Sequence, residues 1–233
     1  MSSSSVPPPT PTVELLEAWT REYILAAKET FANNVSEMEN WLDKDYVQTG
    51  PDIGPLNRAD YLQAFTTYKN SGMDFQKAAP DLLQDMQGFH LDPHNPWRVW
   101  FVVRYSGTHA GTVTLPNSDA QLEPRDPPQK LYGGPELFSI WWTREKTIKW
   151  ETVGYSGDRY TGTNQGYGAV VGILIGMGLP RLAVDILTPV TKLQSWFSQF
   201  VSIGEGLPRT RTPHGELPQW WQDRQKLDFN LRA

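Results

Sequence analysis

The spacing of apolar residues changes along this chain, from a helical period in the first third to a strand period after Pro80. The first set recurs at spacings of three and four: Leu16, Trp19, Tyr23, Ala27 and Phe31. Such a stripe lies on one face of a helix. Later residues alternate instead, with Val99, Phe101, Val103 and Tyr105 separated by Trp100, Val102 and Arg104, which is typical of a strand with two different faces.

Local signals divide these two regions into elements. Val13–Phe31 is predicted as the first helix, and the pair Ser36 and Glu39 forms a capping box for a short helix over Ser36–Asp45. Asn57 is a plausible cap for a third helix. Four strands follow, at Leu82–Leu91, Trp97–Val113, Glu136–Thr143 and Thr147–Tyr155. Helices followed by a meander of long strands predict an α+β domain with helices packed on an antiparallel sheet.

Composition excludes several function classes. The 233 residues carry a net charge of -5 without a run of Lys and Arg, so binding to nucleic acid is not expected. The absence of cysteine excludes thiol catalysis, disulfides and thiolate metal sites. The most apolar run, Ala169–Leu179, is shorter than the ~20 residues of a membrane-spanning helix. With no recognisable secretory signal, we expect a soluble protein with the cytoplasm as the default compartment.

Three regions are expected along the chain. Residues 1–12 are rich in Ser and Pro and are predicted to form a disordered tail. Residues 13–180 contain all the predicted helices and strands of the α+β domain. Residues 181–233 form an extension with an amphipathic segment, a Pro-rich stretch and the pair Trp220 and Trp221. We expect this extension to pack back on its own domain, with binding to a partner as the alternative.

Several motifs resemble those of one known family. The segment RYSGTHAG at Arg104–Gly111 is similar to the GTHxG strand of SnoaL-like proteins, the polyketide-cyclase branch of the NTF2-like superfamily. IKWETVGYSGD at Ile148–Asp158 and the Gly-rich run at Gly166–Pro180 resemble the family's last strand and closing helix. The resemblance covers residues 13–180. It implies a cone-shaped α+β fold with an apolar pocket for a hydrophobic small molecule, no cofactor, and a possible homodimer.

Candidate catalytic residues follow from polar groups on the strands. His109, in the GTHAG motif, has a side chain suited to acid or base chemistry near neutral pH. The family's catalytic aspartate position holds Thr152 or Val153 here, so Glu151 and Asp158 are the nearest replacement carboxyls. In an apolar pocket burial would raise a carboxyl pKa and make it a usable base. The alternatives are a His satisfied at the sheet surface, Glu151 paired with a surface Lys, and Asp158 in a solvated turn.

Candidate ligand-binding residues are mainly aromatic. Large flat rings are typical of pockets for hydrophobic molecules, although most of them also serve as core; the candidates are Trp41, Tyr46, Tyr61, Phe65, Trp100, Phe138 and Trp142. Arg104 would bind an anionic or carbonyl group if it pointed inward. Because it lies five positions before His109, the two side chains have opposite parity on a regular strand.

Two further motifs are interpreted structurally. Gly168, Gly172 and Gly176 lack the βαβ context of a dinucleotide site, and their spacing of four indicates a smooth helix face for close packing. His90 and His94 lie among prolines in a turn, so no metal site is predicted. Two functions remain open: a small-molecule protein with cofactor-independent acid/base chemistry of the cyclase, isomerase or hydrolase type, and a non-catalytic interaction module that uses its C-terminal extension.

Overall fold

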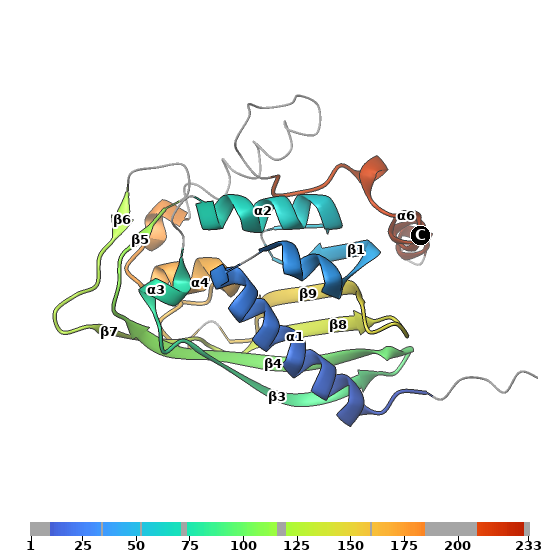
Figure 1. Ribbon diagram of the computed structural model, residues 1–233, viewed down its shortest axis with the longest axis horizontal. Coiled ribbons are helices and arrows are strands. Elements are labelled where there is room, and N and C mark those ends of the chain that lie inside the picture. The colour runs from blue at the N-terminus through green and yellow to red at the C-terminus, as the bar shows by residue number, and fades with distance from the viewer. Residues whose placement is uncertain are drawn as a thin grey trace, which may run out of the picture.

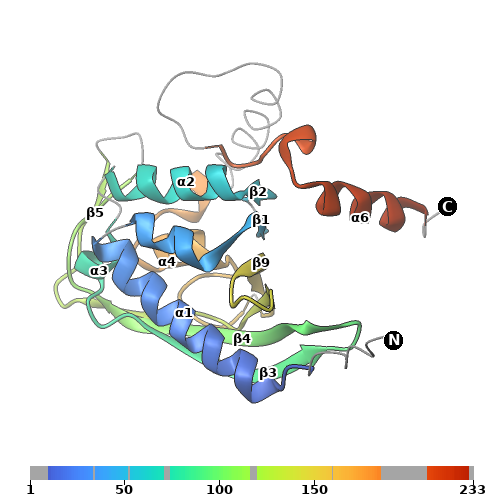
Figure 2. The same cartoon turned by 45° about the vertical axis from the view of Figure 1, so that its right-hand side comes forward.

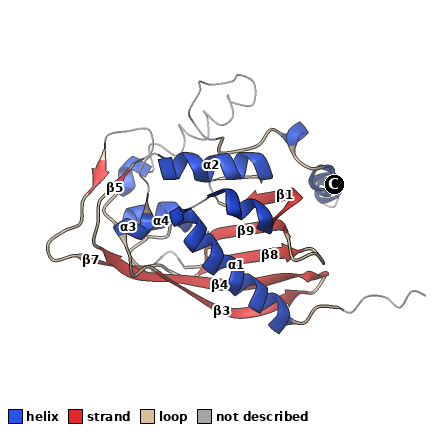
Figure 3. Cartoon of the chain, viewed as in Figure 1, coloured by secondary structure: helices blue, strands red, loops and turns tan. Residues whose placement is uncertain are grey.

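A computed structural model of the chain describes residues 10–33, 35–51, 53–70, 74–115, 120–158, 160–184 and 209–230. It has one main curved sheet, with the N-terminal helices across its concave face (Figures 1 and 2). These are α1 (Val13–Asn33), the 3-10 helix η1 (Val35–Trp41) and α2 (Arg58–Asn70). The α+β fold class predicted from the change of period is confirmed, as the helix and strand colouring in Figure 3 makes plain.

The main sheet has the order β2-β1-β9-β8-β4-β3, with β7 paired to one end of β4. Its strands are β1 (Leu42–Thr49), β2 (Leu56–Asn57), β3 (Leu83–Asp92), β4 (Asn95–His109), β7 (Gln129–Tyr132), β8 (Glu136–Trp142) and β9 (Ile148–Ser156). All neighbours are antiparallel except β1 and β9, which are parallel. A second, two-stranded sheet joins β5 (Val113–Thr114) to β6 (Gln121–Leu122).

The predicted helix over Ser36–Asp45 is wrong in its second half. The 3-10 helix ends at Trp41, and Leu42–Thr49 form strand β1. Asp43, Lys44 and Asp45 hide the strand pattern because they are polar and lie at its less buried end. Pairing of β1 with β9 and β2 overrides the weak local signal.

The predicted hairpin of the two longest strands is confirmed. Antiparallel β3 and β4 meet at a turn in which Asp92 Oδ1 accepts the N–H of His94 at 2.9 Å and that of Asn95 at 3.1 Å. The predicted strand Trp97–Val113 ends four residues early, at His109. Gly111 then passes α3 (Phe75–Ala78) so closely that a Cβ there would lie 2.4 Å from the Lys77 carbonyl oxygen.

The concave face holds the main core. Its buried strand residues follow the predicted alternation, with Val99, Phe101, Val103 and Tyr105 facing the helices and Arg104 exposed on the opposite face. Leu16 and Tyr23 of α1, Met38 of η1 and Tyr61 of α2 complete the same apolar cluster. Burying so many large side chains on one face is what holds the helices against the sheet.

Helix α4 (Ala169–Gly176) closes the end of the cone near β7 (Figure 1). A Cβ at Gly168 would lie 1.7 Å from the carbonyl oxygen of Gly154, so the chain can cross β9 here only with glycine. Gly176 likewise packs against Leu131 and Thr163. The predicted smooth glycine face therefore packs against the same chain, as a helix lying across the cone.

The described part of the C-terminal extension folds back on the domain. Helix α6 (Gln219–Asn230) follows a short 3-10 helix, η2 (His214–Glu216), and Leu217 and Trp221 form a cluster with Val47 and Trp150 on the outer face. Trp220 Nε1 donates to the Asp45 carbonyl oxygen at 2.9 Å. The prediction that residues 181–233 pack on their own domain is thus confirmed for this part of the extension.

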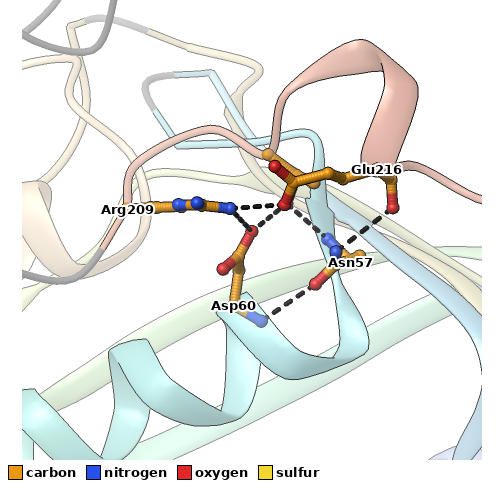
Figure 4. Close-up of polar contacts among 5 residues, drawn as sticks. Asn57, Asp60, Arg209 and Glu216 are labelled. Carbon is orange, nitrogen blue, oxygen red and sulfur yellow. Dashed lines mark hydrogen bonds and ion pairs between the residues drawn. The ribbon is translucent and has the colours of Figure 1, made fainter. Parts of the chain in front are cut away.

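Polar contacts hold the segment before α6 to the start of α2 (Figure 4). Thr212 Oγ1 donates to Asp60 Oδ2 at 2.6 Å, and Arg209 Nη1 lies 2.6 Å from Glu216 Oε2 and 3.6 Å from Asp60 Oδ2. Asn57 Nδ2 donates to the Glu216 carbonyl oxygen at 3.3 Å. Residues 1–9 of the predicted disordered tail and 185–208 of the amphipathic segment lie outside the described residues.

Candidate functional site

Glu151 lies at the centre of the concave interior. It sits on β9 opposite Ile140 of β8, and its side chain is buried. Its Oε2 accepts hydrogen bonds from the hydroxyl groups of Tyr46 at 2.8 Å and Tyr23 at 3.3 Å. Among the described residues, no lysine or arginine forms an ion pair with it. The predicted alternative, a pair with a surface Lys, does not describe this carboxyl.

Burial sets the protonation behaviour of this cluster. Desolvation raises the pKa of Glu151, and hydrogen bonds from Tyr46, Tyr23 and Tyr61 oppose part of that rise. Desolvation, and then the nearby Glu151 charge, raise the pKa of all three tyrosines, so their hydroxyl groups keep their protons. The cluster therefore combines one carboxyl that can gain or lose a proton with three phenols that only donate or accept hydrogen bonds.

Most of the predicted aromatic residues surround this carboxyl or lie beside it. Those that belong to the concave core are Trp41, Tyr46, Tyr61, Phe65, Phe138 and Trp142. Tyr61 packs against Tyr46 with ring centroids 5.0 Å apart and against Phe65 at 4.6 Å. The rings fill the interior around Glu151 with apolar surface.

A second buried carboxyl, Glu136, was missed by the sequence analysis. It is the first residue of β8, and its Oε2 accepts the backbone N–H of Ala169, the first residue of α4, at 2.9 Å. Desolvation raises its pKa to about 7, although the Ala169 N–H and the Tyr105 hydroxyl both favour the charged form. Its spacing of two from Phe138 was the available signal, since that spacing places both side chains on the same face of the strand.

Tyr105 lies between the two carboxyls. Burial raises its pKa most, followed by the charge of Glu136 and, more weakly, by that of Glu151. The charges of both carboxyls thus act on the pKa of one phenol.

A small cavity opens beside Glu136. Its volume is about 10 Å³, close to the least that one water molecule needs. The lining residues come from the position before β3, from β4, from β7 and its connection to β8, from the start of β8, and from α4 and the loop before it: Leu82, Tyr105, Leu131, Tyr132, Gly133, Glu136, Thr163, Asn164, Gly172 and Ile173. Asn164 is almost completely buried, and its Oδ1 has no hydrogen-bond partner among the described residues.

His109 is fully buried at the far end of β4, where it pairs in register with Gln129 of β7. Neither ring nitrogen has a hydrogen-bond partner within the part of the chain that the structure describes. Ten residues of strand, roughly 30 Å at an extended rise, separate it from Val99, the residue that faces Ile140 beside Glu151. His109 and Glu151 are therefore not parts of one cluster.

The other predicted site residues lie away from the interior. Asp158 is in the turn after β9, where its Oδ1 accepts the N–H of Tyr160 at 2.8 Å. Arg104 is exposed on the outer side of β4. Trp100 also faces outward, and its Nε1 donates to Asp92 Oδ2 at 2.9 Å. The structure brings none of these three to Glu151 or Glu136.

Two other kinds of site are not found in the described segments. They contain no group of three or more His, Asp or Glu side chains placed to hold a metal ion. Nor does any helix in them have the length and apolar character needed to cross a bilayer.

Fold and site together define an α+β cone whose interior is built from aromatic rings, phenols and two buried carboxyls. No protein-family model and no curated protein matches the chain. Solved structures do match at low identity. AclR from Streptomyces galilaeus is 12% identical, with 80% of this chain and 98% of that chain covered and a TM-score of 0.43.

A protein from Jannaschia sp. CCS1 described as a SnoaL-like polyketide cyclase is 9% identical, with 70% of this chain and 94% of that chain covered and a TM-score of 0.39. A protein from Novosphingobium aromaticivorans described as a scytalone dehydratase is 11% identical, with 60% and 84% covered and a TM-score of 0.38. One of these descriptions, SnoaL-like polyketide cyclase, names the family that the sequence motifs resemble. At such identities and TM-scores, no residue role is transferred to this chain.

Proposed function

We propose that the chain binds a hydrophobic small molecule in its concave interior and transfers a proton on it without a cofactor. The observation that supports this function is a buried carboxyl, Glu151, which is held by phenols and forms no ion pair with any described Lys or Arg. Burial of an ionisable group is costly unless it is paired, and carboxyls with a pKa raised in this way are typical of acid/base sites.

The chemistry follows from the groups present. Glu151 in its ionised form takes a proton from a carbon next to a carbonyl. The C–H electron pair forms a C=C bond, and the carbonyl π pair moves onto oxygen to give an enolate. The Tyr46 or Tyr23 hydroxyl donates a hydrogen bond to that oxygen, as in other sites that stabilise developing negative charge. Return of the proton to a different carbon completes an isomerisation. Alternatively, the enolate carbon attacks a second carbonyl, and Glu151 returns its proton to the new alkoxide oxygen to complete a cyclisation.

Ligand entry requires movement of side chains, because rings occupy the space around Glu151. Tyr61 and Phe65 belong to α2 and pack on each other, so a shift of this helix would open the interior. Apolar rings of this kind suit a planar hydrophobic ligand. His109 and Asp158 have no part in this proposal, and the predicted homodimer stays a prediction.

Native mass spectrometry of the purified protein tests the proposal, followed by extraction and identification of any bound molecule. We expect wild type and the exposed-site control Glu145→Gln to carry or bind the same hydrophobic molecule. Glu151→Gln should bind it and exchange its acidic C–H with deuterated solvent more slowly by at least about 100-fold. Equal exchange rates in all three proteins would rule out Glu151 as the base.

One observation favours the second function, a non-catalytic module. The interior is filled by rings, and the cavity beside Glu136 has room for about one water molecule. A ligand-free mass in every variant, with no binding of aromatic probes, would support this function instead. A partner of the C-terminal extension would then not contact Trp221, because this residue is buried against the chain itself.

A further inference from the structure

The cavity beside Glu136 is lined by one residue, Asn164, with a buried polar atom that has no hydrogen-bond partner among the described residues. Asn164 Nδ2 donates to the Tyr167 carbonyl oxygen at 2.7 Å, which fixes the orientation of the amide. Oδ1 is therefore the acceptor that remains, and it has no partner among the described residues. An amide oxygen buried without a hydrogen bond costs about 1–3 kcal/mol, so this atom indicates a missing donor.

Glu136 supplies the second polar group of the cavity. Its carboxyl already accepts the Ala169 N–H and has a hydrogen bond with the Tyr105 hydroxyl. In its protonated form the carboxyl can donate one hydrogen bond, and in its ionised form it only accepts. Asn164 and Glu136 together offer one acceptor and one group that can donate.

Size and charge restrict what can enter. A volume of about 10 Å³ accommodates a single oxygen-sized group. Among the described residues that line the cavity there is no Lys or Arg, so a phosphate or carboxylate would meet Glu136 without a compensating cation from them. An ammonium group has donors and no acceptor, so it could not accept the hydrogen bond that a protonated Glu136 donates. A hydroxyl group, with one donor and one acceptor site, matches both partners.

The shape of the cavity is maintained by two glycines. A Cβ at Gly133 would lie 2.8 Å from Cδ2 of Tyr105, and one at Gly172 would lie 3.0 Å from Cβ of Asn164. Side chains at either position would push the two polar walls of the cavity out of place. Leu82, Leu131 and Ile173 supply the apolar part of the lining.

We propose that this cavity is the subsite for the hydroxyl group of a hydrophobic ligand, such as a phenol or an enol. Asn164 Oδ1 accepts the hydrogen bond of the hydroxyl, and Glu136 donates one to its oxygen. This inference rests on the proposed function, which requires a ligand in the cone, and adds the chemical group by which that ligand is oriented.

Matched probes test the subsite. 2-Naphthol and 2-methoxynaphthalene have the same ring system, but only the first has a hydroxyl donor. We expect wild type to bind 2-naphthol roughly tenfold more tightly, as one satisfied hydrogen bond of about 1.4 kcal/mol implies. In Asn164→Leu the two probes should bind equally. Asn164→Asp keeps an acceptor oxygen but loses the donor to Tyr167, so it should retain the preference for 2-naphthol if it folds as wild type by circular dichroism.

The outcomes separate the subsite from the proposed function. Equal binding of both probes by wild type, or a preference that survives in Asn164→Leu, would overturn the subsite. If 2-methoxynaphthalene still bound in the interior and Glu151→Gln still slowed proton exchange, the proposed function would stand without the hydroxyl subsite. Binding of neither probe to wild type would overturn both.

Discussion

The two faces of the sheet each bury a group that can carry charge, and they do so in different ways. On the concave face Glu151 and Glu136 are surrounded by phenols, backbone N–H and apolar rings. On the outer face Arg98 is buried between two rings, with its guanidinium carbon 4.3 Å from the Trp100 centroid and 3.8 Å from the Trp150 centroid. No opposite charge forms an ion pair with any of the three among the described residues.

The buried carboxyls and the buried guanidinium differ in how their protonation responds to desolvation. A carboxyl can take up a proton and become neutral, and burial raises the pKa of Glu136 to about 7. Desolvation, and then the charge of Arg224, lower the pKa of Arg98 to about 10, so it stays charged at neutral pH. Its charge is stabilised by Ser139 and Thr152 hydroxyls at 2.7 Å and 3.3 Å and by the ring faces. The interior can therefore change its charge near neutral pH, whereas the outer face is a fixed structural contact.

The largest effect is expected on the outer face. Trp221 is buried, and its ring lies 5.1 Å from that of Trp150 in an edge-to-face arrangement. Trp221→Ala should weaken docking of the C-terminal segment by about 3–4 kcal/mol, because a large buried ring is lost. Hydrogen exchange of the amides in residues 209–224 measures this.

Trp221→Phe is the matched variant, since Nε1 of Trp221 has no partner among the described residues. Trp221→Phe should weaken docking of the C-terminal segment by about 1 kcal/mol or less. If Trp221→Ala also abolished the pH dependence of stability described next, the two faces would not be independent.

A somewhat smaller effect is expected in the interior. The pKa of Glu136 is raised from 4.5 to about 7 in the folded state, so the folded protein binds its proton more tightly than the unfolded chain does. Stability is then highest below about pH 4.5 and falls as the pH rises to about 7, by up to about 3 kcal/mol. Glu136→Gln should remove this contribution, so its unfolding free energy should fall less between pH 5 and pH 8.

Urea unfolding at a series of pH values measures that slope, with the exposed carboxyl variant Glu145→Gln as control. Glu151, whose pKa is also raised, adds to the decline with the same sign and remains in both variants. A slope in Glu136→Gln equal to that of wild type would mean that Glu136 keeps an ordinary carboxyl pKa.

Strand alternation predicted which residues of the long strand face the helices. The parity of Val99, Phe101 and Tyr105 was correct, because one buried face imposes a period of two, whereas Arg104, a ligand-binding candidate if inward, is exposed. The position of Glu151 in the last long strand was also available from sequence. The sequence did not show that the partners of Glu151 are tyrosines and not a lysine, because Tyr23 and Tyr46 come from elements more than 100 residues away.

Glu136 and strand β1 were missed for related reasons. Glu136 follows Gly133, Gly134 and Pro135, a pattern that indicates a turn, and its burial depends on α4 folding back 33 residues later. In β1 the charged residues suppress a strand pattern that only pairing with β9 reveals. Local sequence signals describe single elements well and long-range burial of polar groups poorly.

The hydrogen bond between Thr212 and Asp60 is expected to contribute less than either core group. Thr212 is buried, donates to Asp60 Oδ2 at 2.6 Å, and accepts the Asn57 N–H at 2.8 Å. Thr212→Val keeps the shape and removes both bonds, so docking of the C-terminal segment should weaken by about 1–2 kcal/mol. The same hydrogen-exchange measurement applies, and Thr161→Val, at an exposed threonine, serves as the control.

The smallest effect is expected from Arg209, which contacts the same carboxylate. Its guanidinium is 3.6 Å from Asp60 and 2.6 Å from Glu216, but its side chain is 41% exposed. Exposed ion pairs contribute about 0–1 kcal/mol and are screened by salt, so Arg209→Ala should weaken docking by less than Thr212→Val does. The difference from wild type should shrink further in 1 M salt, where the Debye length is about 3 Å. If Arg209→Ala were the more damaging change, and salt reproduced it in wild type, charge rather than buried contacts would hold the segment before α6 to the start of α2.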